Sequence, residues 1–570
     1  MKSSSCHSAR VKILFLAILL FAATLIGRLY FLQIVDGATY RAEAEAQYRG
    51  SRRADLNRGA IYFETKDGTL VSAATMKSGY DLAIHPNLIT NATTTFEKIN
   101  AILPIAQDDF FTKAGKPSNW EEIKKYLIPE IGEKLLALKI PGVETVSTNW
   151  RFYPADKLAA NVLGLIGYQG DIIAGRYGLE SYYEDVLKRD ESNLYQNIFA
   201  EIFSGLEKTI IRKSSLEGNI VTTIEPTVEN FLEKKLADLN EKWQPAETGG
   251  IIINPKTGEI YAMANLPTFN PNNFSSEGNV KIFSNPLVEN AYEMGSIIKP
   301  LTVAAGLDAS VITATTTYND AGFVELNGRK ISNFDKKARG VVNMQEVLNQ
   351  SLNTGAVFIM RTLGRDTFSQ YMFNFGIGEE TGIDLPNESP GLANNLKSSR
   401  DVEPATASFG QGVSMTPIMT ARALSVLANG GLLITPHLVK KIEYTAGFSK
   451  NIASDNDKRV LKKEASEEIT RMLVEVVDKA LLNGEVKQEH FSIAAKTGTA
   501  QIANPAGGGY FEDKFLHSFF GYFPAYEPKF LVFLYLYEPV SVNYASQTLT
   551  RPFIDIAKFL LNYYNIPPDR

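Results

Sequence analysis

The spacing of hydrophobic positions divides the chain after about residue 57 into strand-like and helix-like segments. From "NRGAIYFETKDGTLVSA" onward, short alternating stretches are interspersed with helical patterns such as residues 120–138. In "NIVTTIEPTVENFLEKKLADL", a short β-branched strand passes into an amphipathic helix. "GGIIINPKTGEIYAMAN" contains two apolar runs separated by a Pro/Gly turn, a pattern that predicts a β-hairpin.

The last third of the chain carries the clearest patterns. "MTPIMTARALSVLANGG" predicts a helix that Thr416 caps, that Pro417 begins and that glycines end. Three later apolar stretches, "IAAKTGTAQIA", "HSFFGYFPA" and "KFLVFLYLYEP", predict strands joined by short turns, and "RPFIDIAKFLLNYYN" predicts a closing helix. We therefore expect an α+β protein in which residues 218–570 form an antiparallel sheet packed with helices. Residues 33–217 are expected to form a separate pedestal of mixed α/β structure.

The N-terminal segment is long and apolar. Residues 13–32, "ILFLAILLFAATLIGRLYFL", are apolar apart from Thr24 and Arg28, and they are long enough for a transmembrane helix. A cleaved signal peptide is the alternative, but no small-x-small cleavage site follows. Basic residues precede the span, so residues 1–12 are predicted to be a cytoplasmic tail. The rest of the chain is then expected to lie on the extracytoplasmic side of the cell membrane.

Composition excludes several classes of protein. The formal net charge of −5 and the pI near 5.8 indicate no basic surface for nucleic acid. The single cysteine, Cys6, excludes intramolecular disulfides and cysteine-built zinc sites. The histidines are scattered without metal-ligand spacing, and each is interpreted as a surface or ordinary core residue. We expect neither a metal nor an organic cofactor.

The segment "AYEMGSIIKP" places Ser296 three residues before Lys299. If a helix begins near Ser296, the two side chains share one face, with their Cβ atoms roughly 5–6 Å apart. Gly295 and Pro300 favour such a helix start, because the glycine allows a tight entry and the proline lacks an N–H that early helix positions do not need. A serine hydroxyl needs a base, and lysine can serve only if burial or a second cation lowers its pKa from about 10.4.

The second cation is expected to be Lys496 in "IAAKTGTAQ". On that strand, Gly498 is predicted to let an extended peptide approach and pair with the edge. Thr497 and Thr499 would supply hydroxyls for a carboxylate. An ordinary explanation of Lys496 is a strand-edge lysine that discourages aggregation.

A polar relay between the two lysines is expected from Ser351 and Asn353 in "VLNQSLNTGAVFIM". These residues precede a helix of small residues, where short polar side chains can face a cleft. A helix cap explains the pair almost as well, and an N-capping serine with an exposed lysine would explain Ser296 and Lys299. The order, spacing and flanks of the three motifs together favour catalysis.

These motifs resemble a known family. Ser296-x-x-Lys299, Ser351-x-Asn353 and Lys496-Thr497-Gly498 are similar, in order and spacing, to the three motifs of the penicillin-binding fold shared with serine β-lactamases. "NRGAIY", "RYGLESYYEDVL", "TGIDLPNE" and "GQGVSMTP" further resemble class B penicillin-binding proteins, the monofunctional peptidoglycan D,D-transpeptidases. The departures are mild: Met294 stands where the family usually has proline, and "IYFETKDG" is looser than the usual pedestal motif.

The resemblance implies roles on both sides of a cleft. Ser296 is expected to be the acylated nucleophile, Lys299 its base, Ser351 the proton relay and Asn353 an amide that orients the substrate.

On the strand, Lys496 is expected to supply positive potential, while Thr497 and Thr499, with Gly498 between them, hold the terminal carboxylate of the donor. The backbone N–H groups of Ser296 and Thr499 are expected to form the oxyanion hole.

The resemblance also implies an activity and partners. The enzyme would cross-link stem peptides ending in D-Ala-D-Ala, and β-lactam antibiotics would acylate it. A carboxypeptidase or β-lactamase-type hydrolase is one alternative, and a non-catalytic divisome scaffold that binds β-lactams is another, although a scaffold should have lost a motif. Expected partners are a membrane glycosyltransferase and divisome or elongasome proteins, and the compact length favours a division-type role.

Two further motif matches are interpreted as decoys. Lys256-Thr257-Gly258 lies in the predicted hairpin, where Gly258 would supply a positive φ. Ser454-Asp455-Asn456 belongs to a charged run that is typical of a solvated loop.

Overall fold

The computed structural model describes residues 56–170, 172–189, 216–453, 458–504 and 507–570, and six isolated helical positions, Phe15, Leu19, Phe21, Ala22, Thr24 and Leu25. The remainder of the predicted anchor at 13–32 and the predicted tail at 1–12 lie outside the described residues. Within the described part of the chain, no helix combines the length and the apolar character needed to cross a membrane.

The described chain folds as two compact units, one formed by residues up to 57 and 77–150 and the other by residues 58–76 and 151–570. In the smaller unit, Leu82, Ile99 and Phe110 belong to one buried apolar cluster. Its elements are the second half of β2 (Leu70–Ile84), α3 (Ala92–Asn100), α4 (Gln107–Ala114), β3 (Glu121–Leu127), α5 (Pro129–Ala137) and β4 (Val143–Phe152).

The prediction of a helix over residues 120–138 is wrong for the first half of this segment. Residues 121–127 form β3, which pairs antiparallel with β2, and only residues 129–137 are helical. The Glu- and Lys-rich sequence favours a helix locally, but backbone pairing with β2 overrides that propensity. Pro129 then begins α5, since proline suits the first turn of a helix.

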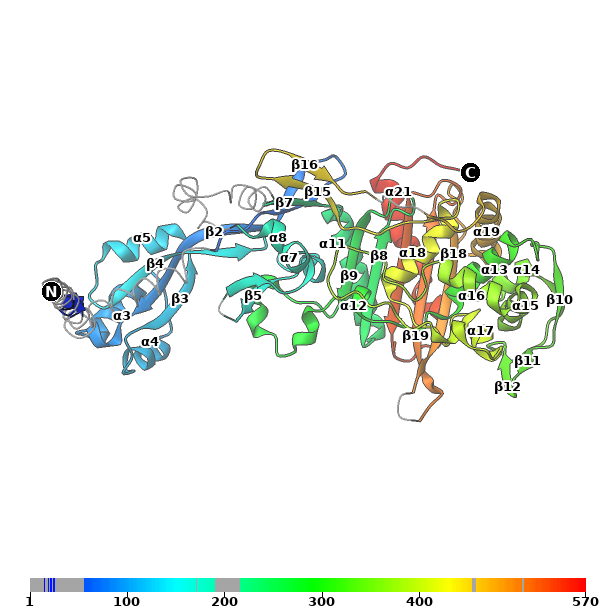
Figure 1. Cartoon of the computed structure of the whole chain (residues 1–570), viewed down its shortest axis with the longest axis horizontal. Coiled ribbons are helices and arrows are strands. Elements are labelled where there is room, and N and C mark those ends of the chain that lie inside the picture. The colour runs from blue at the N-terminus through cyan, green and yellow to red at the C-terminus, as the bar shows by residue number, and fades with distance from the viewer. Residues whose placement is uncertain are drawn as a thin grey trace, which may run out of the picture. The chain divides into compact units, whose positions relative to one another are not determined.

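The larger unit is built on an antiparallel sheet in the order β18-β19-β20-β8-β9 (Figure 1). The predicted hairpin is confirmed as β8 (Glu247–Ile253) and β9 (Ile260–Leu266). The three predicted late strands are confirmed as β18 (Ala494–Ala503), β19 (Tyr510–Phe523) and β20 (Phe530–Tyr537). Because β18 lies at one end of this order, one of its edges has no strand partner among the residues that the structure describes.

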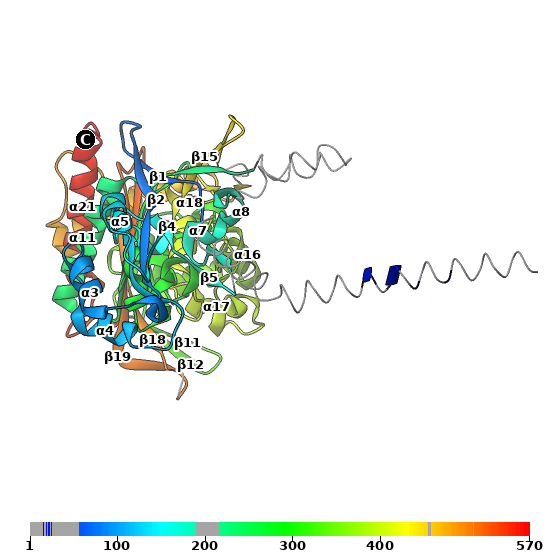
Figure 2. The ribbon, with the colours of Figure 1, turned by 90° about the vertical axis from the view of Figure 1, so that its left-hand side faces the viewer.

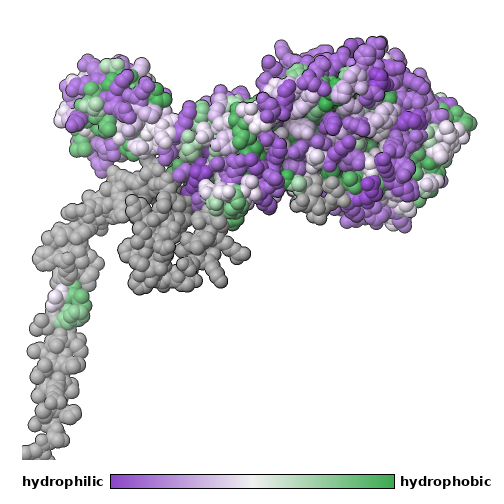
Figure 3. Space-filling view, turned by 90° about the horizontal axis from the view of Figure 1, so that it is seen from above, coloured by the Kyte–Doolittle hydropathy of each residue, from purple (hydrophilic) through white to green (hydrophobic). Residues whose placement is uncertain are grey.

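Helices cover both faces of this sheet (Figure 2). Phe519 packs against α21 (Thr550–Tyr563), with ring centroids of Phe519 and Phe553 4.5 Å apart, and α11 (Pro226–Trp243) covers the same face. Its neighbour Phe520 points to the other face, where it joins a separate buried cluster. The predicted sheet packed with helices is therefore confirmed. The molecular surface visible in Figure 3 is mostly hydrophilic.

The second face carries the helices that position the candidate site. The predicted helix cap is confirmed, because Thr416 accepts a hydrogen bond from the N–H of Met419 at 3.2 Å where α18 begins. The elements of this face are η5 (Gly295–Ile298), α13 (Lys299–Asp308), α14 (Met344–Asn349), α15 (Asn353–Leu363), α16 (Arg365–Asn374), α17 (Val402–Ala407), α18 (Pro417–Ala428) and α19 (Lys463–Glu475).

The larger unit also contains a second set of paired strands. The strands pair in the order β16 (Ser449–Asn451), β15 (Val439–Tyr444), β7 (Gly218–Thr222) and β1 (Ile61–Glu64), and β1 also pairs with residues 70–74 of β2.

A buried ion network also lies in the larger unit. The carboxylate of Glu180 on α7 (Gly178–Tyr182) is fully buried and accepts hydrogen bonds from Arg58 at 2.7 Å and Arg151 at 2.6 Å.

Candidate active site

Ser296 and Lys299 lie at the junction of a short 3-10 turn and a helix. Ser296 belongs to η5, Lys299 begins α13, and the lysine Nζ donates to Ser296 Oγ at 3.0 Å. The two side chains therefore meet, as their spacing predicts. Gly295 takes a positive φ of 65°, and a Cβ on it would lie 3.0 Å from the carbonyl oxygen of Thr499. Glycine is required there because the turn must approach β18 closely.

Lys299 is completely buried, with 0% of its surface exposed. Its Nζ also donates to the carbonyl oxygen of Ser351 at 2.5 Å and to Ser351 Oγ at 3.1 Å. Burial lowers the pKa of Lys299 well below the usual lysine value, and the charge of Lys496 lowers this pKa further. Both effects favour the neutral amine, which has two protons and one lone pair and can therefore accept a hydrogen bond from the Ser296 hydroxyl, as a base must.

Ser351 occupies the turn between α14 and α15. Its φ of 55° is left-handed, a conformation that costs free energy for a residue other than glycine. In this conformation Ser351 Oγ lies 3.1 Å from Lys299 Nζ and 3.2 Å from Lys496 Nζ. The hydroxyl therefore bridges the two lysines.

Asn353 is the first residue of α15. Its side-chain Nδ2 donates to the carbonyl oxygen of Ser332 at 2.9 Å, which fixes the amide plane. Close to Ser332, the exposed ring of Phe334 meets that of Tyr544 edge to face, with centroids 6.1 Å apart. None of Ser332, Phe334 and Tyr544 belongs to a motif, so the sequence offers no signal for them.

Lys496 and the residues after it lie on β18, the edge strand. Burial lowers the pKa of Lys496 to about 8, and its Nζ donates to the carbonyl oxygen of Thr497 at 3.1 Å as well as to Ser351. Thr497 and Thr499 are half-buried and alternate with the inward-facing Lys496 and Gly498.

The structure shows a reason for glycine at position 498 that the sequence did not reveal. A Cβ at this position would lie 2.3 Å from Ser518 Oγ and 2.7 Å from the carbonyl oxygen of Met294. The space that the glycine leaves is therefore filled by the protein itself, which lets η5 and Ser296 pack against β18. A contact between Gly498 and substrate stays a prediction.

The sequence also gave no indication of Ala545. Its backbone N–H donates to Thr499 Oγ1 at 3.1 Å. Main-chain groups have no residue-type signature, so only the fold reveals this partner of the predicted carboxylate-binding threonine.

The structure describes only one of the two motif matches that were interpreted as decoys. Gly258 has a φ of 82° in the turn between β8 and β9, so Lys256-Thr257-Gly258 is confirmed as a turn. Residues 454–456 lie outside the described residues. Across the described parts of the chain, no three His, Cys, Asp or Glu side chains gather as a metal-binding group.

The chain matches two protein families. Residues 248–558, more than half of the chain, match the family described as penicillin binding protein transpeptidase domain, and residues 55–198 match the penicillin-binding protein dimerisation domain. Stage V sporulation protein D of Bacillus subtilis is 28% identical over 535 residues, covering 92% of this chain and 81% of the relative. Peptidoglycan D,D-transpeptidase MrdA of Acinetobacter baumannii is 28% identical over 501 residues, covering 78% of this chain and 72% of the relative.

Solved structures share the fold. Penicillin-binding protein 2X of Streptococcus thermophilus superposes with a TM-score of 0.72 at 19% identity, covering 90% of this chain and 81% of that one. Penicillin-binding protein 3 of Mycobacterium tuberculosis, complexed with aztreonam, superposes with a TM-score of 0.68 at 21% identity, covering 91% and 98%. With both domains matched in order, the chain belongs to the penicillin-binding protein transpeptidase family, as a class B member.

Proposed function

We propose that this chain is a peptidoglycan D,D-transpeptidase that works through an ester on Ser296. One observation carries the proposal: successive hydrogen bonds of 3.0, 3.1 and 3.2 Å connect the side chains of Ser296, Lys299, Ser351 and Lys496 in that order. Both lysines in this series are buried. Such an arrangement supplies a nucleophile, a neutral base and a proton path in one site.

Acylation would begin when Lys299 takes the proton of Ser296. The serine oxygen attacks the carbonyl carbon of the penultimate D-Ala, and negative charge develops on the carbonyl oxygen, where the N–H groups of Ser296 and Thr499 would stabilise it. The proton then passes from Lys299 through Ser351 to the nitrogen of the terminal D-Ala. As that C–N bond breaks, D-Ala leaves and an ester remains on Ser296.

Transfer to an acceptor would reverse these proton movements. An amine of a neighbouring stem peptide attacks the ester carbonyl, a new amide forms, and the Ser296 oxygen recovers its proton. A β-lactam would acylate Ser296 in the same way, but its nitrogen stays tethered after the ring opens. Lys496, Thr497 and Thr499 would hold the carboxylate of either ligand, and Asn353 would orient its amide.

A donor pentapeptide ending in D-Ala-D-Ala, incubated with a second peptide that carries a free amine, tests this activity. Mass spectrometry is expected to find a cross-linked peptide and one released D-Ala per cross-link, both absent in Ser296→Ala. A shortened but uncross-linked donor would favour the hydrolase alternative. Unchanged peptides with wild-type protein would favour the scaffold alternative.

The position in the cell follows from the apolar segment at 13–32. We place residues 218–570 outside the cell membrane as the catalytic region, with residues 33–217 as a pedestal for a membrane glycosyltransferase and divisome proteins. The apolar pattern and the match to a dimerisation domain at residues 55–198 support this assignment. A fluorescent fusion is expected at the septum, and uniform signal along the side wall would instead indicate an elongation role.

A further inference from the structure

A buried histidine lies beside the strand that carries the predicted carboxylate-binding threonines. His517 on β19 pairs in register with Thr499 on β18, so the two side chains leave the sheet on the same face. His517 is 0% exposed, and its Nδ1 lies 3.0 Å from the Oγ1 atom of Thr548 on α20 (Ala545–Thr548). The chemistry proposed above uses neither His517 nor Thr548.

Hydrogen bonds connect this histidine to Thr499 through α20. Thr548 Oγ1 donates to the carbonyl oxygen of Ala545 at 3.2 Å. The N–H of Ala545 in turn donates to Thr499 Oγ1 at 3.1 Å. The path therefore ends on a hydroxyl that is predicted to hold the donor carboxylate.

The Ala545 bond decides what the Thr499 hydroxyl can do. A threonine hydroxyl has one proton to donate and two lone pairs that accept. The Ala545 N–H uses a lone pair and leaves the proton free. Because a carboxylate only accepts hydrogen bonds, a hydroxyl that still has its proton to donate is suited to recognise it.

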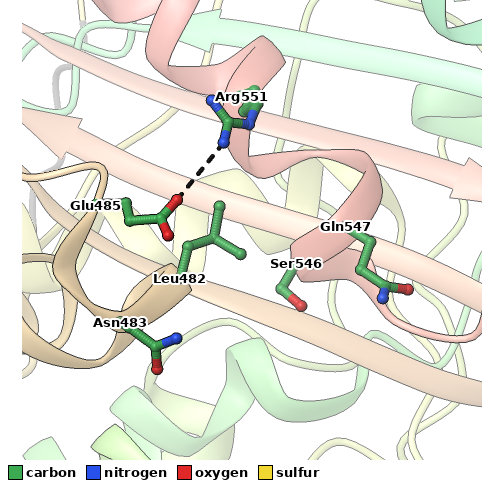
Figure 4. A pocket seen from close by; sticks show the side chains of 6 residues that line it. All are labelled: Leu482, Asn483, Glu485, Ser546, Gln547 and Arg551. Carbon is green, nitrogen blue, oxygen red and sulfur yellow. Dashed lines mark ion pairs between the residues drawn. The ribbon is translucent and has the colours of Figure 1, made fainter.

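Ala545 and Thr548 of α20 are buried, but the other side of this short helix is open. A cavity of about 210 Å³ lies beside it, lined by Ser546 and Gln547 of α20 and by Leu482, Asn483, Glu485 and Arg551 (Figure 4). Both Leu482 and Asn483 have positive φ values, 47° and 55°. Since the cavity leaves this side of α20 without close packing, the hydrogen bonds of Thr548 and Ala545 add to the restraint that the buried side of the helix provides.

We propose that His517 is a positioning residue for substrate recognition: through Thr548 and α20, it fixes the Ala545 N–H that orients the Thr499 hydroxyl toward the donor carboxylate. The inference rests on the proposed function and adds a determinant of specificity for ligands that end in a carboxylate. Burial lowers the pKa of His517 to about 4. The ring is therefore neutral at neutral pH and introduces no charge behind the site.

The test compares acylation of the full chain by benzylpenicillin with acylation by its carboxamide, in which a neutral amide of similar size replaces the carboxylate. The ratio of the two second-order rate constants measures recognition of the carboxylate. In His517→Leu and in the nearly isosteric Thr548→Val, this ratio is expected to fall about tenfold, the scale of one hydrogen bond to a charged group, with the carboxamide rate changed less than about twofold.

Three further variants separate positioning from general damage. His517→Asn places an amide near the position of Nδ1 and is expected to keep most of the ratio. Gln547→Ala, which removes an exposed side chain of the same helix, is expected to leave both rates unchanged. In a Thr499→Val background, His517→Leu is expected to lower the ratio no further, because the hydroxyl at the end of the path is already missing.

Two results would overturn the inference: equal losses of rate for both ligands in His517→Leu and Thr548→Val, or an unchanged ratio in both. Either result would leave the proposed function in place, provided that wild-type protein is acylated at Ser296. Wild-type protein that neither ligand acylates would contradict the proposed function, and the inference would fall with it.

Discussion

Lys299 and Lys496 donate to the same hydroxyl. Their Nζ atoms lie 3.1 and 3.2 Å from Ser351 Oγ, and both side chains are buried. Two ammonium groups in this position each lose solvation and repel one another, so the structure favours a neutral amine on one of them. Because the pKa of Lys299 is lowered by both burial and Lys496, the neutral amine is the one beside Ser296.

The first prediction concerns the pH dependence of acylation. If neutral Lys299 is the base, the rate rises with pH through the pKa of Lys299. In Lys496→Met the neighbouring charge is lost, so the pKa of Lys299 rises and the rising limb moves to higher pH. Rates of labelling by a fluorescent penicillin between pH 5 and pH 10 measure this shift. Lys496→Arg keeps the charge and serves as the control, and a limb that stays in place in Lys496→Met would argue against Lys299 as the titrating base.

The second prediction is that the catalytic lysine reduces stability. The unfolded chain binds more protons than the folded one between the lowered pKa of Lys299 and about 10.4, so this group makes wild-type stability increase with pH across that window. Lys299→Met is expected to abolish acylation and to stabilise the fold by about 1–3 kcal/mol at pH 7. Thermal unfolding is expected to show a smaller gain at pH 10. The exposed Lys487→Met is the control, and a gain that does not depend on pH would contradict this account.

The third prediction concerns Glu180. Burial alone would raise the pKa of Glu180, but Arg151 and Arg58 outweigh it and hold that pKa below the usual range. The stability that this carboxylate contributes is therefore lost as the pH falls through its lowered pKa. Glu180→Gln removes the countercharge of the buried Arg151 guanidinium and leaves Arg58 with Glu184, 2.7 Å away, and the change is expected to cost about 3–5 kcal/mol.

An exposed ion pair provides the matched control for Glu180. Asp555 lies 3.0 Å from Lys235, with 53% of the Asp555 side chain exposed. Asp555→Asn is expected to cost less than about 1 kcal/mol in the same thermal or urea unfolding experiment. Similar costs for the two variants would show that the buried network contributes no more than a surface pair.

The fourth prediction concerns the support of Asn353. Asp320 is 1% exposed and accepts hydrogen bonds from Thr354 Oγ1 at 2.8 Å and from Asn333 Nδ2 at 2.9 Å. These two partners adjoin Asn353 and Ser332, which are themselves hydrogen-bonded. Asp320→Asn replaces an acceptor by a donor there, and the displaced Asn353 is expected to lower the acylation rate about tenfold.

Asp335 offers a control for Asp320 because it lies close to Asn333 but pairs with Arg339 at a partly exposed position. Asp335→Asn is expected to change the rate less than about twofold, as for other surface positions. An unchanged acylation rate in folded Asp320→Asn would show that Asn353 does not need this support.

Local sequence signals predicted the parts of the site that lie close together in the chain. The contact of Ser296 with Lys299 follows from helical spacing, and the strand at Lys496 follows from its alternating pattern. The strand at residues 121–127 could not be predicted, because its composition favours a helix and only pairing with β2 makes it a strand.

Long-range contacts account for the remaining differences. The role of Gly498 depends on the carbonyl group of Met294, and the orientation of Thr499 depends on the N–H of Ala545. Both partners are main-chain groups, which every residue carries, so no motif marks them. The sequence does not predict the left-handed φ of Ser351 either, because a serine rarely adopts this conformation without support from the fold.

The position of the covalent adduct tests the central claim most directly. Full-length protein would be exposed to a fluorescent penicillin, digested, and mapped by peptide mass spectrometry. The account predicts one adduct per chain, on the Ser296 oxygen, and none in Ser296→Ala or Lys299→Met. Wild-type protein with no adduct, or with its adduct on another residue, would contradict it.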